Sequence, residues 1–299
     1  MNVVVTGASG LIGSALVERL RREGHEVTRL VRHRDPLKPD EISWDPQAAR
    51  IDPARLEGRD AIVHLAGESL VGVWTPAKKR RIRESRVAGT RLLAEAIAGL
   101  TRKPAVFVSG SAMGFYGNRP FEDPVDETAP AGTGFLSETA ALWEQAAEPA
   151  ARAGVRVAYA RTSLVLSRNG GMLGKILPLF RLGLGGQLGD GRQAWSWITL
   201  DDEVRAILHI IAREELAGPV NLAAPGAVTN AEFTRAIANA VRRPAPFRVP
   251  AFMLRMIGED FANEMVLGGA RVVPKRLLNT GFVFEHPDLA AALPALVNS

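Results

Sequence analysis

A glycine-rich loop near the start of the chain constrains its fold more than any other feature. Residues 2–6 (NVVVT) are an apolar, β-branched run, and GASGLIG follows at 7–13. SALVERLRREG then has the spacing of a helix, with Leu16 and Leu20 on one face. Glycines between a strand and a helix let the backbone approach a pyrophosphate, whose charge is favoured at the helix N-terminus. The pattern predicts a dinucleotide site, with a purely structural turn as the alternative.

Apolar runs alternate with helical segments through the first half of the chain. Further strands are predicted at 26–31, 60–65, 105–109 and 155–160, and helices at 77–99 and 137–153. Ser137 is the expected N-cap of the second of these helices. The alternation predicts an α/β fold, a Rossmann-type doubly wound parallel sheet with helices on both faces.

The end of the second predicted strand indicates which dinucleotide binds. An NAD-binding fold usually places Asp or Glu about 20 residues past the glycines, where it holds the ribose 2′-hydroxyl. Arg32 occupies that place, followed by His33 and Arg34. A guanidinium suits a 2′-phosphate, so the sequence favours NADP as the cofactor. The alternative is a surface arginine, with Asp35 holding the hydroxyl.

The regular alternation of predicted strands and helices ends after about residue 165. We predict an NADP-binding Rossmann domain at 1–165 to which elements from 200–245 return, a smaller substrate lobe at 166–199 and a C-terminal domain at 246–299. The lobe segment is rich in glycine and is expected to be loop-like around one helix. PFRVP at 246–250 is the candidate linker between helices expected at 230–242 and 250–267.

Composition excludes several classes of protein. There are no cysteines, which rules out disulfides and thiolate nucleophiles, and the 5 histidines lack metal-ligand spacing, so no metal site is expected. The net charge of +5 raises nucleic acid as a partner, but the basic run at 78–83 has no interleaved aromatic residues and is expected to be a solvated helix face. No apolar run reaches the ~18–20 residues of a membrane span. No targeting segment begins the chain, so we expect a cytoplasmic protein.

Several motifs carry a family resemblance. TGASGLIG at 6–13, HLAG at 64–67 and SGSAMGFYG at 109–117 resemble the extended short-chain dehydrogenase/reductase superfamily. The stretches at 66–90, 135–144, 188–202 and 272–293 resemble its epimerase-family subgroup with a C-terminal domain of unknown function. The resemblance implies an NADP-dependent oxidoreductase or nucleoside-diphosphate-sugar epimerase. It also implies a small-molecule substrate and pairing into a homodimer.

The superfamily uses an Asn, a Ser, a Tyr and a Lys for its chemistry, and most of these residues are replaced here. Ser111 takes the place of the serine that orients the substrate oxygen. Phe135 stands where the tyrosine should be, Thr139 where the lysine should be, and Arg86 where the asparagine should be. Phe135 cannot donate a proton, and Thr139 carries no charge that could tune a neighbour. Another group must move the proton, or the protein no longer runs the family reaction.

Candidate replacements lie near the lost pair. Tyr116 and Glu138 are the candidate proton donors, each with a structural role as the alternative. Arg161 ends a predicted strand and could supply the positive charge of the missing lysine, unless it forms a structural ion pair. Arg192 and Gln193 could reach a diphosphate-like anion.

The expected site comprises catalytic and cofactor-binding residues. The catalytic set is Ser111, Glu138 and Tyr116. The cofactor-binding set is Gly7, Ser9, Gly10, Leu11, Ile12, Gly13, Arg32, Leu65, Ala66, Gly67, Glu68, Ser109 and Arg161.

The sequence therefore supports two functional hypotheses. The first is an NADP-dependent oxidoreductase or epimerase for a small hydroxylated or carbonyl substrate, with a nucleotide sugar as one candidate and an unconventional proton donor. The second is a catalytically silent NADP(H)-binding regulatory protein, with cell division as a candidate process.

Overall fold

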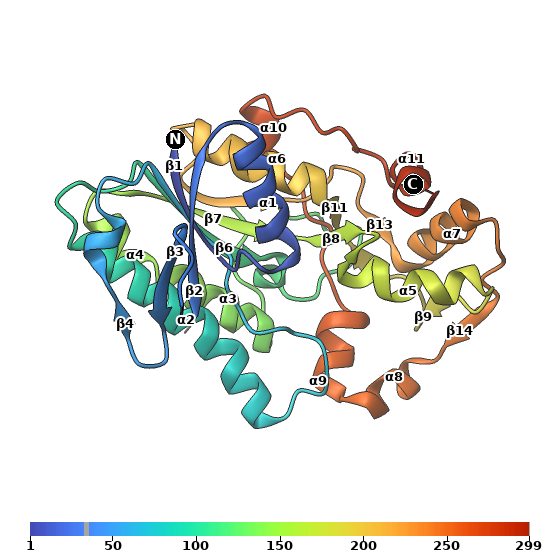
Figure 1. Ribbon diagram of the computed structural model, residues 1–299. Helices are drawn as coiled ribbons and strands as arrows, with labels where there is room; N and C mark the ends of the chain where they lie inside the picture. The colour runs from blue at the N-terminus through green and yellow to red at the C-terminus, as the bar shows by residue number, and fades with distance from the viewer. Residues whose placement is uncertain (33–35, 299) are drawn as a thin grey trace.

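A largely parallel sheet organises the first part of the chain (Figure 1). The computed structural model describes residues 1–32 and 36–298. Within them eight strands pair in the order β12-β7-β6-β5-β1-β2-β3-β4, all parallel except β4, which is antiparallel to β3. The strands are β1 (Asn2–Thr6), β2 (Glu26–Arg32), β3 (Glu41–Asp45), β4 (Arg50–Ile51), β5 (Ala61–His64), β6 (Val106–Ala112), β7 (Arg156–Thr162) and β12 (Gly218–Leu222). The predicted Rossmann-type α/β fold is confirmed.

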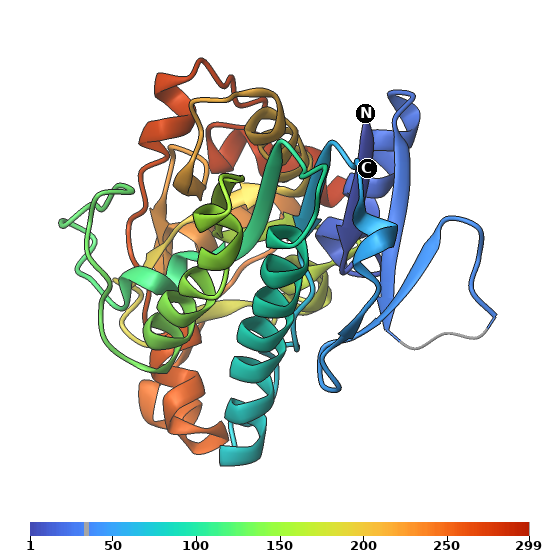
Figure 2. The ribbon, with the colours of Figure 1, turned by 90° about the vertical axis from the view of Figure 1, so that its left-hand side faces the viewer.

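Helices cover both faces of this sheet, as the continuous apolar strands require. In β1, Val3 and Val5 face a core shared with α1 (Leu11–Arg22) and α6 (Leu200–Ala212), whereas Val4 faces the opposite core. That second core is built with α2 (Pro76–Ala98) and α4 (Glu148–Arg152). Figure 2 shows α2 beside α3 (Phe135–Gln145) on this face.

The chain order reverses between β1 and β5, so the crevice at the carboxyl ends of these strands is where a ligand is expected. The loops after the two strands are in contact there. An ideal Cβ built on Gly7 would lie 2.7 Å from the carbonyl carbon of Leu65.

A lobe lies beside the sheet and packs around Trp197, Phe233 and Leu293 (Figure 1). Its elements are β8 (Leu164–Ser167), α5 (Gly171–Arg181), β9 (Gly186–Leu188), β10 (Ala194–Trp195), β11 (Trp197–Thr199), β13 (Val228–Thr229), α7 (Asn230–Val241), β14 (Phe247–Val249) and α11 (Leu289–Asn298). Thus α6 and β12 return to the sheet from 200–245, but α7 packs against α5 and α11.

The C-terminal residues have no hydrophobic core of their own in the part of the chain that the structure describes. Phe282 and Phe284 pack into the α1/α6 core, while Leu289 and Leu293 pack into the lobe. The remaining elements are α8 (Ala251–Ile257), α9 (Glu259–Phe261), a π-helical segment η3 (Ala262–Val266) and α10 (Lys275–Asn279), with 3₁₀ turns η1 (Pro53–Leu56) and η2 (Met113–Tyr116) earlier in the chain. Across residues 1–32 and 36–298, none of the helices combines the length and apolarity of a membrane span.

Several local predictions were wrong. The helix expected at 137–153 begins at Phe135 and is interrupted, giving α3 and α4. Ser137 does not cap it, because Gly134 is the N-cap and the Ser137 hydroxyl donates to the carbonyl of Phe115. PFRVP is not a simple linker, because Phe247–Val249 forms β14 and pairs with β9. The helix expected at 250–267 is divided into α8, α9 and η3.

Candidate functional site

The glycine loop is shaped for a negatively charged group. Gly7 has φ +66°, and an ideal Cβ on Gly13 would lie 2.2 Å from the carbonyl oxygen of Gly7. Gly10 is the N-cap of α1, no side chain caps that helix, and no acidic residue lies in its first turn. The amides at the start of α1 are therefore left to an anion, which is the environment that a dinucleotide pyrophosphate needs.

The HLAG loop is fixed to the glycine loop through Thr6. The Thr6 hydroxyl accepts the N–H groups of Leu65 (3.1 Å) and Ala66 (3.2 Å). The same hydroxyl is hydrogen-bonded to Nδ1 of His64 at 2.6 Å. Burial lowers the pKa of His64 to about 3, so this imidazole is neutral and structural.

Arg32 and Glu68 lie at or just beyond the carboxyl ends of two strands of the sheet, β2 and β5. Arg32 is exposed at the end of β2. Glu68 forms an ion pair with Lys78 at 2.7 Å, and this hydrogen bond is the main reason that the pKa of Glu68 is lowered, to which the charge of Arg32 also contributes. His33, Arg34 and Asp35 lie outside the described residues, so the alternative that Asp35 holds the ribose remains an expectation.

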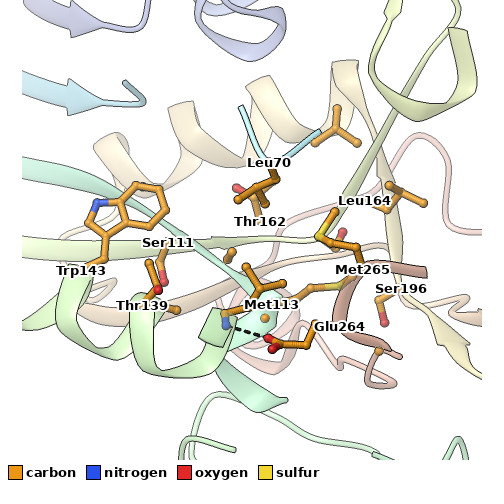
Figure 3. A pocket seen from close by; sticks show the side chains of 18 of the residues that line it. Leu70, Ser111, Met113, Thr139, Trp143, Thr162, Leu164, Ser196, Glu264 and Met265 are labelled. Carbon is orange, nitrogen blue, oxygen red and sulfur yellow. Dashed lines mark hydrogen bonds between the residues drawn. The ribbon is translucent and has the colours of Figure 1, made fainter. Parts of the chain in front are cut away.

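A cavity of about 460 Å³ runs from the glycine loop across the carboxyl ends of β6 and β7 to the lobe. Figure 3 shows Trp143, Ser111 and Thr139 together at one end and Met265, Leu164 and Ser196 at the other. The expected cofactor contacts that line it are Gly7, Gly10, Leu11, Ile12, Gly13 and Leu65. Those that do not line it are Ser9, Arg32, Ala66, Gly67, Glu68, Ser109 and Arg161.

A buried hydrogen-bonded chain leads away from Ser111. The Ser111 hydroxyl lines the cavity and donates to Oε1 of Glu144 at 2.6 Å. Arg161 holds both carboxylate oxygens of Glu144, from Nε and Nη2, each at 2.8 Å. Nη1 of Arg161 donates to the hydroxyl of Tyr116 at 2.9 Å. Because Glu144 is a charged acceptor, the oxygen of Ser111 presents its lone pairs to the cavity.

Three of the predicted roles do not fit these positions. Arg161 is buried in the ion pair with Glu144, which was the structural alternative, and it does not line the cavity. Tyr116 is 0% exposed and donates to Oδ1 of Asn221, and burial raises its pKa. The side chain of Glu138 is 65% exposed and pairs with Arg83. Neither Tyr116 nor Glu138 can reach a substrate in the cavity.

Other side chains, which sequence reasoning did not assign to the site, line the cavity. Arg86 stands at the family's asparagine position and places a positively charged side chain in the cavity wall. Its guanidinium lies 5.1 Å from the ring centroid of Trp143. Burial lowers the pKa of Arg86 to about 10. Thr139 is buried, and its hydroxyl has no hydrogen-bond partner within the described structure. Glu264 enters from η3. Arg86 and Thr139 could have been assigned to the cavity from the sequence, because they stand where the family has its catalytic asparagine and lysine.

Comparisons with known proteins identify the family. The model of the NAD dependent epimerase/dehydratase family matches residues 3–223, and that of a domain of unknown function, DUF1731, matches residues 249–296. Epimerase family protein Mb2239 of Mycobacterium bovis is 45% identical over 292 residues, which are 97% of this chain and 96% of that protein.

Solved structures share the fold over the whole chain. The crystal structure of the human epimerase family protein SDR39U1 with NADPH has a TM-score of 0.90 and 34% identity, covering 100% of both chains. The nucleoside-diphosphate sugar epimerase from Corynebacterium glutamicum has a TM-score of 0.83 and 36% identity, covering 99% of this chain and 58% of that one.

Proposed function

Because the chain belongs to the NAD dependent epimerase/dehydratase family and carries the C-terminal domain of the subgroup that its motifs resemble, we propose that it is an NADP(H)-dependent oxidoreductase or epimerase. Its substrate would be a small alcohol or carbonyl compound. The observation that carries the proposal is the continuity of one cavity from the glycine loop to the hydroxyl of Ser111.

The glycine loop and Arg32 would hold NADP, as the uncapped start of α1 and the exposed guanidinium at the end of β2 support. When bound, this cofactor supplies hydride chemistry. NADPH in the human relative supports the choice of phosphate-bearing dinucleotide.

Proton transfer in this proposal uses Ser111 in place of the missing tyrosine. Its oxygen accepts a hydrogen bond from a substrate hydroxyl, because its own proton points to Glu144. During oxidation, the substrate hydroxyl gives its proton to Ser111 Oγ while the Ser111 proton passes to Glu144 Oε1. Reduction reverses both transfers. Ser111 is the catalytic residue, and Glu144, held by Arg161, positions it and takes the proton.

Ser111→Ala should lower turnover by about 10²-fold, the lower end of the usual range for a positioned acid or base, and leave NADPH affinity unchanged. The measurement is steady-state NADPH oxidation beside a direct titration of NADPH. Ser167→Ala is the matched control, because that serine is buried in β8, accepts the N–H of Asn169 and does not line the cavity. Equal turnover in both variants would remove Ser111 from the mechanism.

Arg32→Ala should weaken NADPH binding by about 10- to 100-fold, since a charge-assisted hydrogen bond contributes ~1.5–3 kcal/mol, and should not change NADH binding. Energy transfer from Trp143 and Trp195, which line the cavity, to the bound nicotinamide gives both affinities. Arg50→Ala, on β4 at the edge of the sheet, is the control. Wild-type protein with equal affinity for both dinucleotides would contradict the role given to Arg32.

Tight NADPH binding without turnover of any carbonyl would instead favour the regulatory hypothesis.

A further inference from the structure

The part of the cavity beyond the glycine loop has a mainly apolar wall. Side chains from the loop after β5, the turn η2, α3, β8, α5 and η3 converge on it (Figure 3). They are Leu70, Met113, Leu136, Leu164, Met172 and Met265. Methionine side chains adapt to irregular apolar shapes, so this wall favours a hydrocarbon surface.

Charged side chains are scarce among the described residues that line the cavity, where only Arg86 and Glu264 carry a charge. Nη1 of Arg86 already donates to the backbone carbonyls of Glu68 (3.0 Å) and Ile82 (3.1 Å). A diphosphate is usually held by arginines that offer two parallel donors. Arg192, which the sequence suggested for that purpose, is exposed and does not line the cavity.

Glu264 lies against the start of α3, a position that favours a negative charge. Its carboxylate accepts the backbone N–H groups of Phe135 (3.0 Å) and Leu136 (2.8 Å) at the start of α3, and the second of these bonds is drawn in Figure 3. The amides of this helix start are therefore already satisfied. The fixed negative charge also repels a phosphate that approaches the same end of the cavity.

The loop after β5 and helix α8 present apolar side chains to solvent. Val71 and Val73 follow Leu70 and are exposed, as are Phe252 and Met256 of α8. The two segments are held together, because Trp74 and Phe261 pack edge to face with ring centroids 5.7 Å apart.

We propose that the compound that reacts beside Ser111 is an uncharged, largely apolar alcohol or ketone, and that Glu264 excludes nucleotide sugars. This inference rests on the proposed function for the reaction itself. The binding preference stands separately from turnover and is tested without it.

The test measures the binding of two probe ligands to the protein saturated with NADPH. Binding is measured by calorimetry and by quenching of tryptophan fluorescence. 2-Decanone is the apolar probe, and UDP-glucose is the nucleotide-sugar probe. We expect 2-decanone to bind at least about ten-fold more tightly than UDP-glucose, a difference of about 1.4 kcal/mol. Tighter binding of UDP-glucose, or no binding of 2-decanone, would overturn the inference. Binding of 2-decanone would leave the substrate preference standing whether or not NADPH is oxidised, whereas the absence of turnover with any carbonyl compound would reject the proposed function.

Variants of Glu264 test the exclusion directly. Glu264→Ala frees two amides and removes the negative charge, so UDP-glucose affinity should rise by about ten-fold. Glu264→Gln removes the charge but keeps an acceptor for the amides of α3, so this variant is expected to fold. It should also bind UDP-glucose more tightly than wild type. Glu259→Ala, an exposed acidic residue of the same segment, is the control. Unchanged UDP-glucose affinity in folded Glu264→Gln would contradict the role of Glu264.

Discussion

Gly13→Ala should weaken NADPH binding by about 10²- to 10⁴-fold. A Cβ at this position would lie 2.2 Å from the carbonyl oxygen of Gly7, so the loop must open to admit it. Opening the loop removes amide donors from the pyrophosphate, and the loss of two charge-assisted hydrogen bonds at ~1.5–3 kcal/mol each gives this range. The measurement is the NADPH titration by energy transfer from the tryptophans that line the cavity.

Gly99→Ala is the control for a general effect of the extra methyl group. Gly99 is the C-cap of α2 with φ −79°, and its nearest contact would be 3.6 Å away. Thermal melting followed by circular dichroism should show that both variants are folded. If folded Gly13→Ala bound NADPH as tightly as wild type, the glycine loop would not be the pyrophosphate site.

Glu203→Gln should stabilise the protein increasingly as the pH rises from about 4.5 to about 8. Burial raises the pKa of Glu203 from 4.5 to about 8, with one compensating hydrogen bond from the hydroxyl of Thr162 at 2.8 Å. Its other oxygen, Oε2, has no partner within the described structure. The folded protein therefore keeps a proton on Glu203 that the unfolded chain has lost.

The sign of this effect follows from the direction of the shift. Below the unfolded pKa both states are protonated, and Glu203 adds no pH-dependent penalty. As the pH rises towards the folded pKa of about 8, stability falls, by up to about 4 kcal/mol. Glutamine does not titrate, so the unfolding free energy of Glu203→Gln does not fall with pH in this way. Burying the amide donors of glutamine lowers that free energy by about 1–2 kcal/mol at every pH.

Urea unfolding at several pH values measures the difference between wild type and Glu203→Gln. Glu18→Gln is the control, because that carboxylate is exposed on α1 in an ion pair with Arg22, and surface pairs contribute only about 0–1 kcal/mol. A difference between wild type and Glu203→Gln that stayed constant from pH 4.5 to 8 would show that Glu203 is not protonated in the folded protein.

Local patterns were enough to predict most strands of the main sheet and the glycine loop, but not β3 and β4 at the edge of the sheet. The run at 2–6, the glycine loop and the strands at β5, β6 and β7 lie where the sequence placed them. Each of these elements is specified by neighbouring residues, because alternate side chains of an apolar strand must meet helices on both faces. The position of Ser111 followed from its motif in the same way.

The features that the sequence did not predict depend on contacts between residues that are distant in the sequence. The acceptor for Ser111 is Glu144, 33 positions away, and the cap of α3 comes from Glu264, 128 positions beyond Leu136. β14 was missed because its pairing with β9 is what makes Phe247–Val249 extended. Arg86 was recognised as a lost asparagine but not as a charge in the cavity, because only the fold brings α2 against that wall.

The described C-terminal residues pack into cores that earlier parts of the chain build, and this has a consequence for synthesis on the ribosome. A nascent chain that has emerged as far as Leu222 already contains every strand of the main sheet and the whole glycine loop. It still lacks Glu264 at the start of α3 and the stretch around 264–270 that closes the cavity. The strands of the main sheet and the glycine loop are therefore synthesised before the residues that complete the wall of the cavity, and the cavity takes its final form only after residue 270 has emerged.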